Sequence, residues 1–139
     1  MGHEESRRYA LLMETVLNKQ HEQPFVCVVD GDPAVRDGLT YLCQSNGHNV
    51  MAFSTGAAFL RQLDKRLTTK CVICEAQLPD GSGVRLYQEF CRRGNDAPFA
   101  LLLSRPSGEQ TARALKLGID FVWAKPLTEQ SALVAFLEN

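Results

Sequence analysis

Five short apolar runs, each followed by apolar residues at helical spacing, constrain the fold of this chain more than any other feature. Each run is too short to be a buried helix and is bounded by polar, Gly or Pro residues, as is typical of strands covered on both faces. The runs occupy residues 25–30, 48–53, 70–75, 98–104 and 119–123, and the helical patterns occupy residues 33–45, 55–63, 84–93, 107–117 and 128–137. This alternation predicts a doubly wound α/β fold, in which right-handed crossovers place helices on both faces of a parallel sheet.

A further helical pattern precedes the first strand, at residues 6–20. The apolar residues on one side of this helix are Tyr9, Leu12, Met13, Val16 and Leu17. A helix with one apolar stripe needs a surface on which to bury it, either on the domain or on a partner. We therefore divide the chain into an N-terminal helical extension, residues 1–23, and a domain, residues 24–139.

Composition argues against several classes of function. The 15 basic and 16 acidic side chains give a net charge of -1, without the clustered basic excess of a nucleic-acid-binding surface. No apolar run approaches the roughly 20 residues that span a bilayer, and the charged N-terminus is unlike a secretory signal. The five cysteines are typical of reduced thiols, so we expect a cytoplasmic protein that binds neither nucleic acid nor membrane.

Cys71 and Cys74 form a C-x-x-C pattern within the third apolar run. In a strand, positions i and i+3 point to opposite faces, and neither a second cysteine pair nor a histidine cluster completes a zinc site. We expect both thiols to belong to the core.

Polar side chains stand at the end of four of the predicted strands. Asp30, Glu75 and Ser104 end the first, third and fourth strands, and Lys125 follows the fifth. In doubly wound folds the ligand site lies outside the carboxyl ends of the strands. Two carboxylates, a hydroxyl and an amine are therefore expected to converge on one edge of the sheet.

The sequence around these residues resembles the receiver domain of bacterial two-component response regulators, over roughly residues 25–138. V-V-D-G-D matches the acidic motif after the first strand, and E-A-Q-L-P-D-G-S-G matches the loop after the third. L-L-L-S and A-K-P match the Ser/Thr after the fourth strand and the Lys-Pro after the fifth. Four motifs on the expected elements are specific together, although none is specific alone. The resemblance implies a five-stranded, flavodoxin-like sheet of order 2-1-3-4-5 and a signalling module rather than an enzyme.

The resemblance also implies roles for individual residues. In the family, an Asp at the end of the third strand becomes an acyl phosphate, and two acids after the first strand hold Mg²⁺. A Ser/Thr and a Lys then contact the phosphate and shift the fourth helix and fifth strand, which exposes a new interaction face. Asp30, Ser104 and Lys125 match an acid and the two phosphate contacts.

Three positions depart from the family pattern. Glu75 stands in place of the nucleophilic Asp, Gly31 in place of the second acid, and Val122 in place of an aromatic switch residue, with Phe121 and Trp123 beside it as possible substitutes. Glu is one methylene longer than Asp, which places its carboxylate about 1.5 Å further out. A displacement of about 1 Å can lower the rate on the order of 10²-fold, because phosphoryl transfer depends on positioning.

The loss of an acid at Gly31 also weakens the expected metal site. Mg²⁺ is usually held by one or two carboxylates, and Asp30 and Glu75 are the remaining candidates. Asp32 could reach the site in place of the missing acid, but its role as N-cap of the first domain helix competes.

These departures predict a degenerate receiver, or pseudo-receiver, that works with little or no conventional phosphorylation. Glu75 would pair with Lys125 in a buried ion pair that holds one conformation. Two interpretations of Glu75 stay open: the longer acid partly mimics a phosphorylated Asp, or it is a relic solvated at the pocket rim.

Two other hypotheses compete with the pseudo-receiver. In the first, the domain still accepts phosphate on Glu75 or Asp30 with the help of Mg²⁺. Asp80 could also accept phosphate, although turn chemistry explains P-D-G better. In the second, the fold is a flavodoxin-like module that binds a small molecule, which the absence of a Gly-rich phosphate loop after the first strand disfavours.

We expect no cofactor other than weakly bound Mg²⁺. The expected partner is another protein or a second copy of the chain, through the fourth helix, fifth strand and last helix of the domain, near which Leu115, Trp123 and Val134 lie. The helical extension could add to such a dimer, and a strictly monomeric species in light scattering at high concentration would count against it. The module would act alone as an adaptor or as the regulatory domain of a longer transcription regulator, with a sensor kinase as partner only if phosphorylation occurs.

Overall fold

The computed structural model describes residues 2–127 and 130–138, and for residues 14–22 it describes the backbone alone. A parallel sheet of five strands lies at the centre, in the order β2-β1-β3-β6-β7, which is the predicted order 2-1-3-4-5. Its strands are β1 (Phe25–Val29), β2 (Asn49–Phe53), β3 (Thr69–Glu75), β6 (Phe99–Leu103) and β7 (Phe121–Ala124). The helices are α1 (His3–Glu22), α2 (Pro33–Ser45), α3 (Gly56–Asp64), α4 (Gly83–Arg92), α5 (Gly108–Lys116) and α6 (Gln130–Leu137). The predicted doubly wound fold is confirmed.

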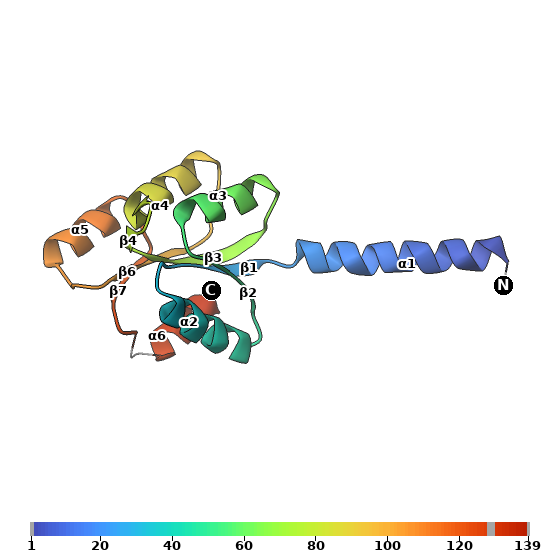
Figure 1. Cartoon of the computed structure of the whole chain (residues 1–139), viewed down its shortest axis with the longest axis horizontal. Coiled ribbons are helices and arrows are strands. Elements are labelled where there is room, and N and C mark those ends of the chain that lie inside the picture. The colour runs from blue at the N-terminus through green and yellow to red at the C-terminus, as the bar shows by residue number, and fades with distance from the viewer. Residues whose placement is uncertain (1, 128–129, 139) are drawn as a thin grey trace.

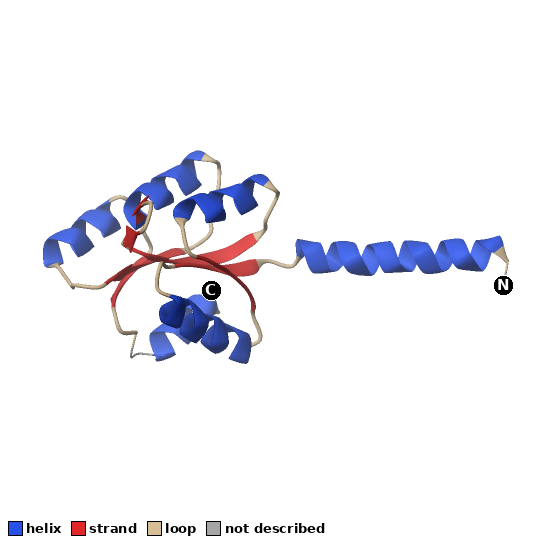
Figure 2. Ribbon diagram, viewed as in Figure 1, coloured by secondary structure: helices blue, strands red, loops and turns tan. Residues whose placement is uncertain are grey.

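The helices cover the sheet in two layers, with α3, α4 and α5 on one face and α2 and α6 on the other (Figures 1 and 2). Alternate strand residues contribute to each layer, so Cys74 packs with Phe59 and Phe90 on the first face, and Cys71 packs with Phe136 on the second. The predicted placement of the two thiols on opposite faces is therefore confirmed. Burial raises the pKa of the Cys71 thiol to about 12, as expected of a core residue.

Side-chain caps explain where the helices of the domain begin. Asp32, Thr55, Ser82 and Ser107 lie in extended conformation at the N-caps of α2, α3, α4 and α5, and each accepts a hydrogen bond from a backbone N–H of the first turn. The predicted cap of the last helix, Thr128, lies outside the described residues.

The loop after β3 contains two elements that the sequence pattern did not predict. β4 (Gln77–Leu78) and β5 (Gly81–Ser82) form a small antiparallel pair around Pro79 and Asp80. The chain then passes so close to β3 that a Cβ on Gly83 would lie 2.3 Å from the backbone oxygen of Glu75. Only glycine fits there, so the pair and Gly83 together fix the path of the loop over the end of β3.

The last strand begins later than predicted, at Phe121 rather than at residue 119. Just before this strand, Asp120 links the chain to β6 through its side chain and its backbone. Its carboxylate accepts a hydrogen bond from the Phe99 N–H at 2.7 Å, and its own N–H donates to the Phe99 carbonyl. Ile119 is buried in the core instead of pairing in the sheet.

The predicted N-terminal helix is present as α1, which projects away from the sheet as a separate rod (Figure 1). Of the predicted apolar stripe, Tyr9, Leu12 and Met13 are exposed, while the side chains of Val16 and Leu17 lie outside the description. Within the described part of the chain, no helix is long and apolar enough to cross a membrane.

Candidate functional site

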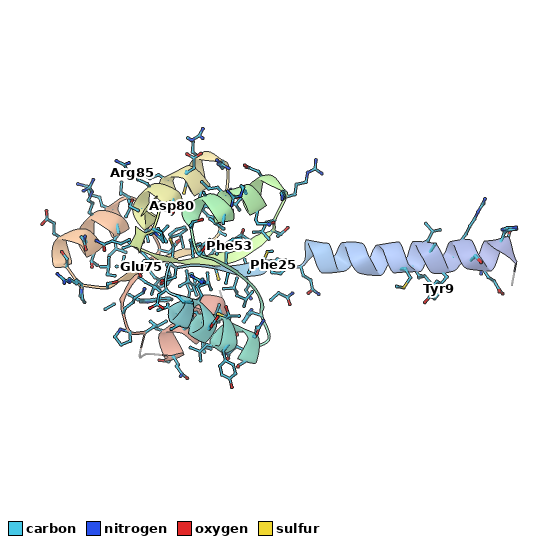
Figure 3. All side chains as sticks on the ribbon, in the orientation of Figure 1. Tyr9, Phe25, Phe53, Glu75, Asp80 and Arg85 are labelled. Atoms are coloured by element: carbon cyan, nitrogen blue, oxygen red, sulfur yellow. The ribbon has the colours of Figure 1, made fainter. Side chains whose placement is uncertain are left out.

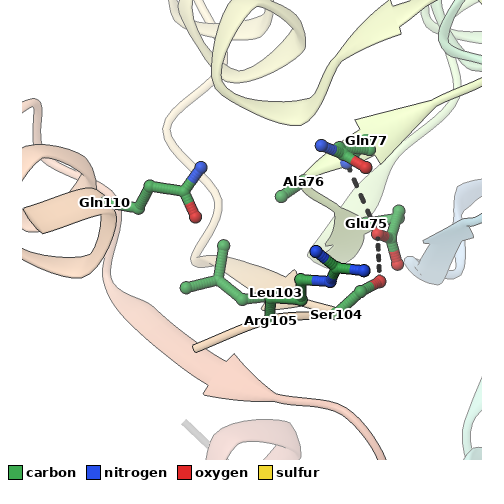
Figure 4. A pocket seen from close by; sticks show the side chains of 7 residues that line it. All are labelled: Glu75, Ala76, Gln77, Leu103, Ser104, Arg105 and Gln110. Carbon is green, nitrogen blue, oxygen red and sulfur yellow. Dashed lines mark hydrogen bonds between the residues drawn. The ribbon is translucent and has the colours of Figure 1, made fainter. Parts of the chain in front are cut away.

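The side chains predicted to converge meet at the carboxyl edge of the sheet. Asp30 follows β1, Glu75 ends β3, Ser104 follows β6 and Lys125 follows β7. The Lys125 ammonium contacts both carboxylates, and the Ser104 hydroxyl contacts Glu75. The predicted convergence is confirmed, and Figure 4 shows the Ser104 side of this site.

Glu75 is almost completely buried, with 4% of its surface exposed. Its Oε1 accepts hydrogen bonds from the Ser104 hydroxyl at 3.0 Å and from the Gln77 N–H at 3.4 Å (Figure 4). Its Oε2 forms an ion pair with the Lys125 ammonium. The predicted ion pair is confirmed, and the interpretation of Glu75 as a relic solvated at the pocket rim is wrong.

Asp30 is buried to a similar degree, with 2% of its surface exposed. Its Oδ1 accepts a hydrogen bond from the Asp32 N–H at 2.8 Å, and its Oδ2 lies 2.7 Å from the Lys125 Nζ. Asp32 itself is exposed, and its carboxylate accepts a hydrogen bond from the Ala34 N–H at 2.9 Å. Asp32 is therefore the helix cap rather than a replacement for the missing acid.

Lys125 is the counter-ion of both acids. Its side chain is 17% exposed, and its backbone N–H donates to the Leu103 carbonyl at 2.8 Å, next to a cis peptide bond to Pro126. Burial lowers the pKa of Lys125, but the hydrogen bonds and charges of Asp30 and Glu75 outweigh this and hold the pKa above its usual value. Apart from this ammonium, Asp30 Oδ2 and Glu75 Oε2 have no polar partner among the described residues, so the stability of both charges depends on Lys125.

Gly31 occupies a position at which there is no room for a side chain. A Cβ at residue 31 would lie 2.8 Å from Cγ and 3.0 Å from Cδ of Pro79. The proline ring belongs to the loop between β4 and β5, so an acid at residue 31 would require that loop to shift.

The donor set fits a tightly held divalent metal poorly. Its two buried carboxylates are already paired with an ammonium, Gly31 supplies no ligand, and Asp32 is used as a cap. Among the described residues, no three His, Cys, Asp or Glu side chains are grouped so that they could hold a metal ion.

Val122 and its aromatic neighbours lie on opposite faces of β7. Val122 packs into the core layer beneath α3, α4 and α5. Phe121 and Trp123 point the other way, toward α6, where each ring meets Phe136 edge-to-face at centroid distances of 5.4 and 5.2 Å. Neither aromatic can replace a switch residue on the face of Val122 without leaving this cluster.

Asp80 has a structural role in the described chain. Its two carboxylate oxygens accept hydrogen bonds from the Gly56 and Ala57 N–H groups at 3.0 Å each, at the start of α3. The Ala57 N–H contributes most to holding the pKa of Asp80 below its usual value. Asp80 therefore ties the loop to the start of α3, and Figure 3 labels it on the side of the sheet that carries α3 and α4.

Several residues of the site carried no signal in the sequence. Beside Glu75 and Ser104 lies a pocket of about 320 Å³, whose lining includes Gln77, Arg105 and Gln110 (Figure 4). These side chains come from a two-residue strand, a loop and the first turn of a helix, so no periodicity marks them. The contact between Pro79 and Gly31 carries no signal in the sequence either.

We expect Lys125→Met to lower the free energy of unfolding by about 3 kcal/mol at pH 7, because it leaves two buried carboxylates without a cation. Urea denaturation measures the loss, and adding Glu75→Gln should restore part of it. Because folding raises the pKa of Lys125, its contribution is complete below the unfolded pKa of about 10.4 and disappears as the pH rises through the folded value. Lys116→Met on the exposed surface is the control, and equal stability of the two variants would contradict the assignment.

We expect Gly31→Ala to destabilise the domain by about 1–3 kcal/mol, because the added methyl overlaps the Pro79 ring. Gly38→Ala is the matched control, since a Cβ there meets nothing within 4 Å, and a helical Gly→Ala change should stabilise α2 by roughly 0.5–1 kcal/mol. Thermal or urea unfolding compares the pair. A neutral or stabilising Gly31→Ala would show that the space is open.

Known proteins share both the sequence and the fold of this domain. The family described as "Response regulator receiver domain" matches residues 26–138. The response regulator protein TmoT of Ectopseudomonas mendocina is 30% identical over 123 residues, which are 86% of this chain and 55% of that protein. The transcriptional regulatory protein FixJ of Bradyrhizobium diazoefficiens is 32% identical over 117 residues, 82% of this chain and 55% of that protein. The chain thus spans about half the length of the curated relatives it matches.

Solved structures agree with this assignment. The BeF3-activated DrrB receiver domain has a TM-score of 0.72 and 25% identity, covering 84% of this chain and 99% of that one. A receiver domain protein from Clostridium thermocellum has a TM-score of 0.76 and 20% identity, covering 84% of this chain and 92% of that one. The chain therefore belongs to the response regulator receiver domain family.

Proposed function

We propose that this receiver domain is a degenerate member of its family, which regulates through protein–protein contacts with little or no phosphorylation. The observation that carries the proposal is the state of Glu75. Its carboxylate is buried, paired with Lys125 and hydrogen-bonded to Ser104. In the family, the lysine and the hydroxyl at these positions contact the phosphoryl group of the phosphorylated acceptor. Here the carboxylate of Glu75 already binds both groups.

Two further observations support the proposal. The position of the second acid is Gly31, where Pro79 leaves no room for a side chain, so we expect Mg²⁺ to bind weakly at most. The switch position is Val122, and its aromatic neighbours are held on the other face of β7 by Phe136. Acceptor, metal and switch positions are therefore altered together, and we assign no enzymatic activity to the domain.

The proposed interaction surface is formed by α5, β7 and α6. Leu115 and Phe121 on this surface are 48% and 38% exposed, which provides apolar area for a homodimer or another protein partner. In this proposal the chain consists of a helical extension, residues 1–23, and a receiver domain, residues 24–139. The helix of the extension, α1, would enlarge the interaction surface.

The biological setting follows from the relatives. FixJ is a transcriptional regulatory protein of about twice the length of its match to this chain. We therefore infer that the chain is the regulatory domain of a longer transcription regulator in the cytoplasm. In that arrangement another part of the regulator binds DNA, this domain contacts neither DNA nor membrane, and a sensor kinase is not required for its active state.

Intact-mass spectrometry after incubation with acetyl phosphate and Mg²⁺ tests the proposal. We expect the wild type to gain no phosphoryl group, because the acceptor is too long and the metal site lacks an acid. If Glu75→Asp alone restores phosphorylation, residue 75 determines the state, whereas a need for Gly31→Asp as well would assign the defect to both positions. Phosphorylation of the wild type, on Glu75 or on Asp30, would contradict the proposal and identify a working receiver with an unusual acceptor.

A further inference from the structure

A groove of about 380 Å³ lies between α4 and α5, next to the site described above. It shares Gln77, Leu103 and Gln110 with the pocket of about 320 Å³ beside Glu75. The two hollows are therefore continuous, but Glu75 and Ser104 line only the first. Each has the volume of a small-molecule site, for which roughly 300–1,000 Å³ is typical.

The groove combines an apolar floor with a basic rim. Val84 of α4 and Leu117 after α5 are the more exposed apolar residues of the lining, whereas Leu101 and Leu103 of β6 are at most 4% exposed. Arg85 of α4 and Arg113 of α5 are also part of the lining. None of the described residues that line the groove is acidic. Arg105 adds a third guanidinium in the adjoining pocket, where it is drawn next to Ser104 (Figure 4).

The two arginines of the groove and Arg105 of the adjoining pocket have no counter-ion among the described residues. Within the described chain, Arg85, Arg105 and Arg113 make neither an ion pair nor a side-chain hydrogen bond. By contrast, Arg92 and Arg93 on the outer side of α4 are paired with Glu89, and Arg93 also pairs with Asp64 at 2.6 Å. Glu75, the acid of the adjoining pocket, is paired with Lys125. The described lining of the groove therefore carries two positive side chains beside an apolar surface and no acidic side chain.

We propose that the groove between α4 and α5 binds a small organic dianion with a compact apolar body, such as an aromatic or aliphatic dicarboxylate. The apolar body would lie against Val84 and Leu117, and the two acidic groups would accept charge-assisted hydrogen bonds from Arg85 and Arg113. The glutamines of the rim, Gln88 and Gln110, offer amide donors to the same groups.

Such a ligand would connect α4 to α5, and α5 belongs to the proposed dimerisation surface. The ligand would then supply the signal that the domain does not receive from phosphate. This regulatory role rests on the proposed function, whereas binding at the groove does not.

Isothermal titration of the full chain with terephthalate tests the site, with the neutral terephthalamide and matched ionic strength as ligand controls. We expect one terephthalate per chain and amide shifts in NMR at Gln88, Gln110 and Ala114. We expect Arg85→Gln/Arg113→Gln to weaken binding at least about tenfold, since charge-assisted hydrogen bonds are lost. Arg61→Gln/Arg66→Gln removes the same charge near the end of α3 and should leave the affinity unchanged.

Three results would overturn the inference. The first is that terephthalate shows no saturable binding in the millimolar range, and the second is that both double variants weaken its binding equally. The third is that an acidic peptide occupies the groove and terephthalate does not. The titration involves no phosphoryl donor, so its failure is distinguishable from a failure of the proposed function, which mass spectrometry reports separately.

Discussion

The contact of one ammonium with two buried carboxylates is the interaction on which the rest of the site depends. Lys125 follows β7, whereas Asp30 and Glu75 belong to β1 and β3, so the ion pairs connect strand ends that are far apart in the sequence. Burying a carboxylate is costly unless it is paired and hydrogen-bonded. The Asp32 N–H and the Ser104 hydroxyl supply those hydrogen bonds. Without Lys125, the two carboxylates would have to be hydrated or protonated.

Among the departures from the family pattern, Gly31 is the one that changes the charge of the site. The family combines three carboxylates with one lysine, and a divalent cation balances the excess negative charge. Here Gly31 leaves two carboxylates facing Lys125, so less charge remains to attract a metal. Glu75 is long enough to reach both Lys125 and Ser104 from the end of β3. Lys125 thus balances one of the two carboxylate charges, and the site keeps less negative charge than three carboxylates with one lysine would have.

The sequence predicted the architecture well because strand and helix periodicities are local, and the topological rule brought Asp30, Glu75, Ser104 and Lys125 together. It left open whether Glu75 is buried, since the depth of a strand end depends on the loops that cover it. The contact of Gly31 with Pro79, the cap that Asp80 provides to α3 and the groove between α4 and α5 all depend on tertiary contacts. No local pattern encodes such contacts, so these features required the structure.

The most direct test of the central claim is an amide NMR titration of the wild-type domain with Mg²⁺ and beryllofluoride, which imitates an acyl phosphate. If Lys125 holds both carboxylates and the acceptor position is closed to a phosphoryl group, the signals of Ser104 and of α5 and β7 will stay unchanged at saturating beryllofluoride. Shifts that begin at Ser104 and extend through α5 and β7 would contradict this account, because they would show a pocket that still accepts the phosphoryl geometry and transmits it.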